Sequence, residues 1–306
     1  MAVDARARWV PVRWHRGRAS LYVAPALAIV AAGVYLPFLA MLGLSVFDWN
    51  LVAPRPPFVG LANYRALWQD PRFVQALTNT GWYLAGLLPV LVALPLVVAS
   101  ALFHLSPRAT ALYRPLLFLP AVISFSVASL IWLWILNPLS GPLVPVFQRL
   151  GAAPPNWLAA PASARWGISA IVAWRFFGQN VILYLAGFAN LSRDVIEAAR
   201  IDGASEWQVL LRVSLPLLRP TVVVVGIFTL SAIATYSFVP IQILTQGGPF
   251  GATTNVVYAI WQDTFDFLKI GAGATVGVVV FVLFLAAAAA LRRLLERVRL
   301  DEHHAV

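Results

Sequence analysis

Long apolar stretches without charged residues dominate the pattern along this chain. A helix needs about 20 mainly apolar residues to cross the roughly 30 Å of hydrocarbon in a bilayer. Five stretches of that length or more lack Asp, Glu, Lys and Arg, and a sixth contains only Arg175. The pattern therefore predicts an all-α integral membrane protein. Its six transmembrane helices are expected at 21–47, 81–104, 115–136, 166–190, 221–244 and 270–291.

The basic residues divide unevenly between the two sides of this predicted topology. Cytoplasmic segments of membrane proteins carry an excess of Lys and Arg. With six spans, both termini and the 105–114 and 191–219 loops share one side and hold fifteen of the 22 basic residues, against six on the other side. We therefore expect both termini in the cytoplasm. The expected divisions are a basic segment at 1–20, a transmembrane domain at 21–291 and a tail at 292–306.

Composition agrees with a membrane location and excludes several function classes. Of the 306 residues, 60% are hydrophobic and 11% are charged, whereas soluble domains have about 25% charged residues. The net charge of +10 does not indicate a nucleic-acid partner, because the basic residues lie between apolar runs and form no single solvated patch. The chain has no cysteine and therefore no thiolate metal site. We expect a multi-pass protein of the plasma (inner) membrane, surrounded by lipid bilayer, without a metal site.

The segment 191–219 is the most informative polar part of the chain. Asp194 and Glu197 place acid in the first turns of a predicted helix, where the positive end of the helix dipole favours it. Gly203 can adopt the left-handed conformation that ends a helix. We expect a first short helix that ends near Gly203.

A second short helix is predicted directly after the first. Ser205 and Gln208 have the spacing of a capping box, which opens a helix. Pro216 is expected to stop this helix, and Pro220 fits the first turn of the next span. The product is an elbow of two short helices across the cytoplasmic mouth. The residues alone leave two uses open: docking of another protein on the small Ala198 and Ala199, or attachment to lipid headgroups.

The elbow resembles the EAA loop of permease subunits of ATP-binding-cassette (ABC) importers. That family pattern is E-A-A, three residues, G, nine residues, then I-x-L-P. The chain has Glu197, Ala198, Ala199, Gly203 and a final V-S-L-P that ends at Pro216, so it departs only by Val for Ile. Three other stretches resemble the carbohydrate-uptake branch, the maltose and glycerol-3-phosphate permease type. They are 58–64 (FVGLANY), 113–120 (YRPLLFLP) and 244–249 (LTQGGP).

The resemblance implies a type I ABC importer permease that imports a sugar or sugar-like solute. In this family the elbow docks into a cleft on a separate ATPase, which supplies the energy. The implied coupling residues are Glu197, Ala198, Ala199, Arg200, Asp202, Gly203 and Pro216. The implied partners are a second permease subunit in a heterodimer, two ATPase subunits and an extracytoplasmic solute-binding protein.

The chain itself is not expected to hydrolyse ATP or to bind a cofactor. A P-loop needs G-x-x-x-x-G-K-[ST], and the single lysine, Lys269, follows Leu268. ATP and Mg²⁺ are therefore expected on the partner ATPase, and no catalytic residue is predicted here.

Polar residues within spans are candidates for the solute path, because such groups are costly in lipid. Arg175 and Gln179 lie four residues apart on one face of the fourth span. Arg175 could equally extend to the headgroups, and its sequence position leaves both readings open. The candidate path residues are Val172, Arg175, Phe176, Gln179, Asn180 and Tyr236.

A secondary transporter or channel driven by an ion gradient, without an ATPase, is the alternative function. It would need a relay of buried ionisable groups, and no predicted span contains an acidic residue between its ends. That absence argues against proton coupling, although it does not exclude every ion.

Overall fold

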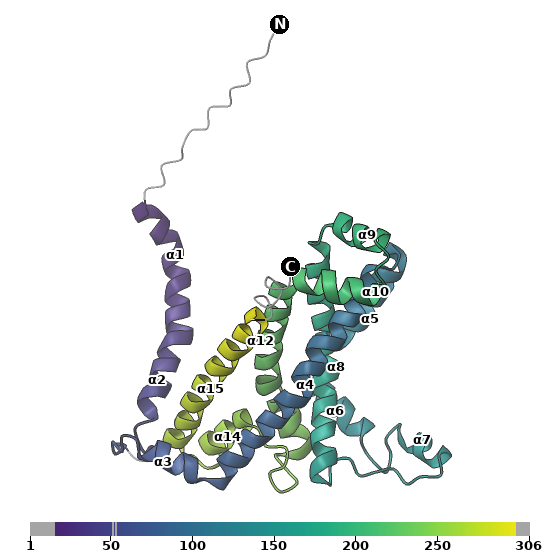
Figure 1. Ribbon diagram of the computed structural model, residues 1–306. Helices are drawn as coiled ribbons and strands as arrows, with labels where there is room; N and C mark the ends of the chain where they lie inside the picture. Colours follow the sequence, from purple (N-terminus) through teal and green to yellow (C-terminus); the bar gives the residue numbers. More distant parts are fainter. Residues whose placement is uncertain (1–15, 51, 53, 298–306) are drawn as a thin grey trace.

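The computed structural model describes residues 16–50, 52 and 54–297, and every element in that part of the chain is helical (Figure 1). The first half contains α1 (Arg16–Val30), η1 (Ala31–Tyr35), α2 (Leu36–Leu44), α3 (Ala62–Gln69), α4 (Pro71–Phe103), α5 (Pro107–Val122), α6 (Phe125–Ile135) and α7 (Val144–Arg149), where η denotes a π-helical segment. The second half contains α8 (Pro161–Ala189), α9 (Arg193–Ile201), α10 (Glu206–Gln208), η2 (Val209–Ser214), α11 (Leu215–Leu217), α12 (Arg219–Tyr236), α13 (Phe238–Pro240), η3 (Ile241–Thr245), α14 (Val256–Trp261), η4 (Gln262–Asp266) and α15 (Ile270–Arg297).

Five helices of the described part are long and apolar enough to cross a membrane, and a bent pair makes the sixth candidate. The five are Tyr22–Leu44, Pro71–Phe103, Pro161–Ala189, Arg219–Thr245 and Ile270–Arg293. Each coincides with a predicted span, although α4 begins ten residues before the predicted start at 81. The earlier start arises because the Asp70 side chain accepts a hydrogen bond from the Arg72 amide and Pro71 occupies the first turn.

The third predicted span, 115–136, is not one straight helix. It consists of the end of α5 and all of α6, which are bent by 94° relative to each other. Ile123 and Ser124 are extended between them, and the Ser124 hydroxyl accepts from the Val127 amide and so caps α6. Sequence pattern could not show this break, because an uncharged serine leaves the apolar run intact.

Residues 137–165, between the third and fourth predicted spans, also contain helical structure. The short helix α7 lies within this segment, and α8 begins at Pro161, ahead of the predicted start at 166. Pro161 occupies the first helical turn, where its missing N–H costs no hydrogen bond. After residue 58 the chain turns at Gly60, which has φ +56°, and enters the short helix α3.

The core lies where α4, α8 and α12 meet. Asn180 of α8 is fully buried, and its amide donates to the Leu91 carbonyl of α4 and to Thr229 Oγ1 of α12, at 2.8 and 2.9 Å. Gly178 lets the backbones of α8 and α5 touch, because a Cβ there would collide with the Leu117 carbonyl oxygen. A small residue at such a contact is typical of helix packing in membranes.

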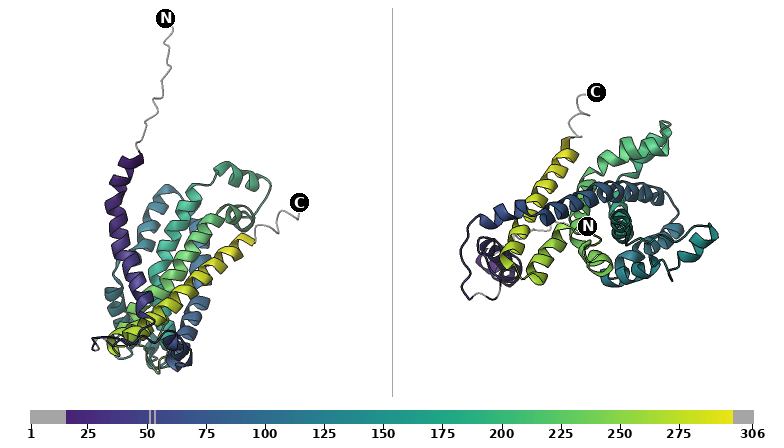
Figure 2. Two further views of the ribbon diagram at one scale, coloured as in Figure 1. Left: turned by 90° about the vertical axis from the view of Figure 1, so that its left-hand side faces the viewer. Right: turned by 90° about the horizontal axis from the view of Figure 1, so that it is seen from below.

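The first membrane-spanning segment stands apart from this core. No residue of its apolar window, Tyr22–Leu44, is buried within the chain, and Figure 2 shows α1 and α2 beside the other helices in two further views. Its contact with the bundle is near its lower end, where the Phe38 and Phe281 rings have centroids 4.7 Å apart. The start of α1, the elbow and the end of α15 lie at one end of the molecule, and α3, α7 and α14 lie at the other (Figure 1).

Candidate functional site

The elbow has the two-helix form that its sequence predicts. Helix α9 ends at Ile201, and Gly203 reverses the chain with φ +86°. Ser205 then accepts from the Gln208 amide, while the Gln208 side chain accepts from the Ser205 amide at 2.8 Å. This reciprocal pair is the predicted capping box, and it fixes the direction in which the second helical segment leaves the turn.

The second segment is longer than expected, because Pro216 does not end it. The chain remains helical from Glu206 to Leu217 through the π-helical turn η2, and it breaks at Leu218. Pro216 lies in the first turn of α11, directly after η2, where the loss of one N–H donor is tolerated. The stop predicted at Pro216 is therefore wrong by two residues.

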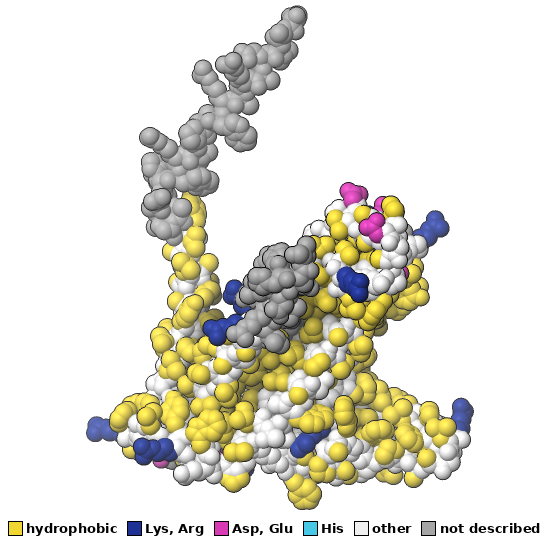
Figure 3. All heavy atoms as spheres, viewed as in Figure 1, with side chains coloured by type: hydrophobic (Ala, Val, Ile, Leu, Met, Phe, Trp, Pro, Cys, Tyr) yellow, Lys and Arg dark blue, Asp and Glu magenta, His cyan; other side chains and the backbone are white. Residues whose placement is uncertain are grey.

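One side of the elbow packs inward, and the other is open to solvent. Ile196, Val209, Leu210 and Ser214 are buried. Among the predicted coupling residues Glu197, Ala198, Asp202 and Gly203 are exposed, and Ala199, Arg200 and Pro216 are half-buried. Figure 3 shows acidic side chains gathered on the elbow, with basic and apolar side chains beside them.

Large apolar side chains accompany these coupling residues on the open side. Ile201 is 85% exposed, directly before the turn at Gly203. Val195, Trp207 and Leu211 are also exposed. We call Val195, Ile201, Trp207 and Leu211 the exposed apolar side of the elbow. Exposed apolar side chains that lie close together are typical of surfaces that contact another protein or a membrane.

An ionic contact fastens the elbow to the end of α4. Arg200 Nη2 lies 2.9 Å from His104 Nδ1 and donates to Glu206 Oε2 at 3.0 Å. The hydrogen bond from Arg200 holds the pKa of Glu206 below its ordinary value, so this carboxylate stays charged. Burial lowers the pKa of His104, and the charge of Arg200 lowers it further, while Glu206 opposes both. The neutral form of the His104 ring is therefore favoured. Only the neutral ring has a nitrogen that can accept a hydrogen bond from the Arg200 guanidinium.

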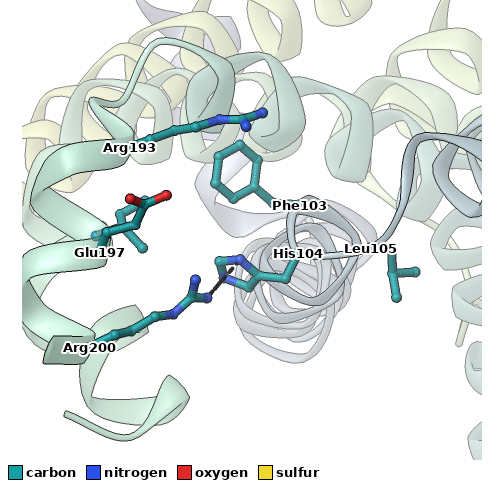
Figure 4. Close-up of a pocket in the computed structure, with 7 residues that line it drawn as sticks. Phe103, His104, Leu105, Arg193, Glu197 and Arg200 are labelled. Atoms are coloured by element: carbon teal, nitrogen blue, oxygen red, sulfur yellow. Dashed lines mark hydrogen bonds between the residues drawn. The ribbon is translucent and has the colours of Figure 1, made fainter. Parts of the chain in front are cut away.

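The sequence alone does not identify His104 as a contact of the elbow. No local signal could have found this residue, because it lies 96 positions from Arg200. Figure 4 shows His104 and Phe103 at the end of one helix, facing Arg193, Glu197 and Arg200 on another. These residues line a cavity of about 270 Å³ between α4 and α9.

Three of the six candidate path residues form a second cluster at the break between α5 and α6. The Arg175 guanidinium lies 4.4 Å from the centroid of the Phe125 ring and donates to the Pro120 carbonyl at 2.6 Å. The exposed Tyr236 ring stacks on Phe125 with centroids 5.1 Å apart, and its centroid lies 5.5 Å from that of Phe176. The structure thus brings Arg175, Phe176 and Tyr236 together.

The other three path candidates lie differently. Gln179 is half-buried on α8, whereas Val172 is fully buried in the core. Asn180 is buried among α4, α8 and α12 by the hydrogen bonds described above. Among the described residues, no group of three or more His, Asp and Glu side chains could hold a metal ion.

Comparison with known proteins identifies relatives over nearly the whole chain. Residues 24–300 match the family described as the binding-protein-dependent transport system inner membrane component. The sulfoquinovosyl glycerol transport system permease protein SmoG of Agrobacterium fabrum is 32% identical over 299 residues, which cover 94% of each chain. The lactose transport system permease protein LacF of Rhizobium radiobacter is 31% identical over 269 residues, 86% of this chain and 89% of LacF.

A solved structure agrees in fold. A chain of a bacterial alginate ABC transporter, crystallised in complex with an alginate pentasaccharide-bound periplasmic protein, superposes with a TM-score of 0.80 at 19% identity. The match covers 92% of this chain and 95% of that chain. The fold of an ABC importer permease, expected from the EAA-like spacing, is thereby confirmed. The family match and the relatives above 30% identity show that this chain belongs to the inner-membrane components of binding-protein-dependent transport systems, the permease subunits that work with a separate ATPase.

Proposed function

We propose that the chain translocates a sugar or sugar-like solute inward and is driven by an ATPase that docks on the elbow. The relatives' names support this solute class, because they include permeases for lactose, sulfoquinovosyl glycerol and arabinooligosaccharides. In this proposal Glu197, Ala198, Ala199 and Gly203 form the docking surface, with Arg200, Asp202 and Pro216 at its edges. ATP and Mg²⁺ bind to the partner ATPase.

The exposed apolar side of the elbow is the observation that carries the coupling proposal. Ile201 and Trp207 expose most of their surface, at the end of the molecule that also holds the start of α1. Burying such side chains on a partner is favourable by roughly 25 cal/mol for each Å² of apolar area. The adjacent Ala198 and Gly203 carry little or no side chain, so a partner's backbone can approach closely.

The orientation follows from the basic residues and from the arrangement of the ends. The start of α1, the elbow and the end of α15 share one end of the molecule (Figure 1), and that side carries most of the basic residues. We therefore place this end in the cytoplasm. The opposite end, with α3, α7 and α14, then faces the solute-binding protein.

A second permease subunit completes the assembly in this proposal. The window Tyr22–Leu44 has no buried residue in the single chain. An apolar groove of about 280 Å³ lies between α4 and α15 and is lined by Leu84, Val280 and Phe284. Both surfaces fit helices of a sister permease in a heterodimer, with one ATPase under each permease.

The solute path is proposed at the cluster of Arg175, Phe176 and Tyr236. An exposed aromatic ring and a nearby guanidinium can stack on a sugar ring and hydrogen-bond its hydroxyls. Gln179, one helical turn from Arg175, adds a further hydrogen-bonding group. Val172 and Asn180 would support this surface from within the core.

Charge-altering changes on the elbow test the coupling proposal. In the assembled importer, Glu197→Lys and Ile201→Glu should each weaken ATPase binding by at least about tenfold, because each places a charge against the docked partner. Solute uptake in proteoliposomes should fall in parallel, while the amount of inserted protein stays the same. The matched control is Arg108→Glu, a charge reversal on α5 outside the elbow. Wild-type uptake and ATPase retention by both elbow variants would contradict the proposal.

A further inference from the structure

A second cavity, of about 370 Å³, lies beside the elbow where α4 and α8 end and α5 begins. Its walls combine polar and apolar surface, and the apolar part includes Leu102, Leu105, Leu185 and Leu191. Two arginines, Arg114 of α5 and Arg193 of α9, also line it. Its volume lies in the range of about 300–1,000 Å³ that is usual for small-molecule sites.

The charge in this cavity is one-sided. Arg114 and Arg193 are both exposed, and neither forms a hydrogen bond or ion pair with any residue that the structure describes. No acidic side chain lines this cavity, although Arg193 also lines the neighbouring cavity, to which Glu197 contributes. Arg193 also lies in the first turn of α9, at the positive end of that helix dipole. An anion between the two guanidinium groups would relieve this concentration of positive charge.

The position of the cavity specifies the kind of anion. Leu185 lies one helical turn, about 6 Å, deeper in α8 than Ala189, the last residue of that helix. The cavity therefore extends from the level of the headgroups toward the hydrocarbon. Charge at one level and apolar surface below it match an amphiphile better than a soluble anion.

We propose that this cavity binds an anionic glycerophospholipid, with its headgroup phosphate held between Arg114 and Arg193. The planar guanidinium groups match phosphate oxygens in geometry and charge. Because Arg114 belongs to α5 and Arg193 to the elbow, the bound lipid fastens the elbow to α5. The site therefore makes ATPase coupling dependent on anionic lipid, a consequence that rests on the coupling role proposed for the elbow.

Lipid retention by the assembled importer tests the site. The importer is reconstituted in nanodiscs of phosphatidylcholine with phosphatidylglycerol. Native mass spectrometry then measures the phosphatidylglycerol that stays bound to the importer when the importer is released from the nanodisc. Each of Arg114→Gln and Arg193→Gln should lower its affinity about fivefold, the fold-change that corresponds to ~1 kcal/mol for each basic residue near anionic lipid. The double variant should lose nearly all bound phosphatidylglycerol, and Arg114→Lys should retain part of it.

The matched control is Arg108→Gln, which removes one exposed arginine from the same helix without touching this cavity. Equal retention by the double variant and the wild type, or an equal loss in the control, would overturn the site. Displacement of the lipid by millimolar glycerol phosphate would overturn the lipid as occupant and indicate a soluble anion.

Retention is measured without ATP or solute, so its outcome does not depend on the proposed transport function. ATPase activity is then compared in nanodiscs with and without phosphatidylglycerol. Stimulation by phosphatidylglycerol in the wild type, lost in Arg114→Gln, supports the coupling consequence. If the arginine variants lose bound phosphatidylglycerol but ATPase activity is the same with and without it, the coupling consequence is overturned and the lipid site is supported.

Discussion

Arg200 of α9 contacts His104 at the end of α4, with Nη2 and Nδ1 2.9 Å apart. Glu206, after the turn at Gly203, lies 2.9 Å from Arg200 Nε and 3.4 Å from His104 Nε2. One guanidinium therefore joins both halves of the elbow to a membrane-spanning helix. A force applied to the elbow by a docked partner passes to α4 through this contact as well as through the covalent chain.

This contact should weaken as the pH falls. The pKa of His104 in the folded chain is below its ordinary value of 6.5, so the folded state disfavours protonation. Its contribution to stability is therefore complete above about pH 6.5 and is lost as the pH falls toward the lower folded value. Hydrogen exchange of the α9 amides should increase between pH 7.5 and 5.5, after correction for the intrinsic exchange rate.

The variant His104→Asn separates this effect from general acid destabilisation. Asparagine offers an acceptor oxygen to Arg200 but cannot be protonated, so its corrected exchange should not change with pH. The Arg200–Glu206 pair should persist over this interval, because the pKa of Glu206 lies below its ordinary value of 4.5. A wild-type profile as flat as that of the asparagine variant would contradict the role of His104.

Gly178 should be the least tolerant of the α8 glycines to a single methyl group. In Gly178→Ala the new Cβ would meet the Leu117 carbonyl of α5, so α5 and α8 must separate. Overpacking of this kind costs about 1–3 kcal/mol. Gly86→Ala on α4 is the matched control, because its Cβ would meet no atom within 4 Å. Melting temperatures in detergent should fall for Gly178→Ala only, and equal values for both variants would contradict the close approach.

The solute path can be tested at Tyr236 and Arg175. If stacking carries the binding, Tyr236→Phe should retain solute affinity, and Tyr236→Ala should lower it roughly twofold to tenfold. The double variant Arg175→Ala with Gln179→Ala should reduce affinity further, because both hydrogen-bonding groups are lost. Solute binding by the purified importer measures these effects. Wild-type affinity in the double variant would assign Arg175 to its contacts with Pro120 and Phe125 alone.

Local patterns predicted the spans and most of the elbow. The membrane thickness fixes the length of an apolar run, and the capping pair Ser205 and Gln208 involves neighbours in sequence. The break at Ser124 and the contact with His104 depend on interactions that a hydropathy pattern does not record. Arg175 illustrates the limit, since its sequence position allowed two orientations and could not show that the guanidinium contacts Phe125 on another helix.

Phe250 should contribute to binding of the solute-binding protein. It is 91% exposed in the segment between η3 and α14, at the end of the molecule opposite the elbow. Three side chains donate hydrogen bonds to the backbone around it. Gln75 donates to the Phe250 carbonyl at 2.9 Å, and Asn79 donates to the Gly251 carbonyl at 2.9 Å. Arg165 donates to the Ala252 carbonyl at 2.7 Å. An aromatic side chain presented by a fixed backbone loses little entropy on binding.

Phe250→Ala should therefore raise, by roughly tenfold, the concentration of binding protein that gives half-maximal stimulation of ATPase activity. A change of this size is expected for a central aromatic contact. Gln75→Ala keeps the ring but removes one backbone anchor, so its effect should be smaller. Leu139→Ala, an equally exposed side chain on a different loop, is the control. Titration of the solute-loaded binding protein against the reconstituted importer measures all three. If Phe250→Ala behaves like Leu139→Ala, the binding protein contacts the outer face elsewhere, and the fixed backbone around Phe250 serves the packing of α4 and α14 alone.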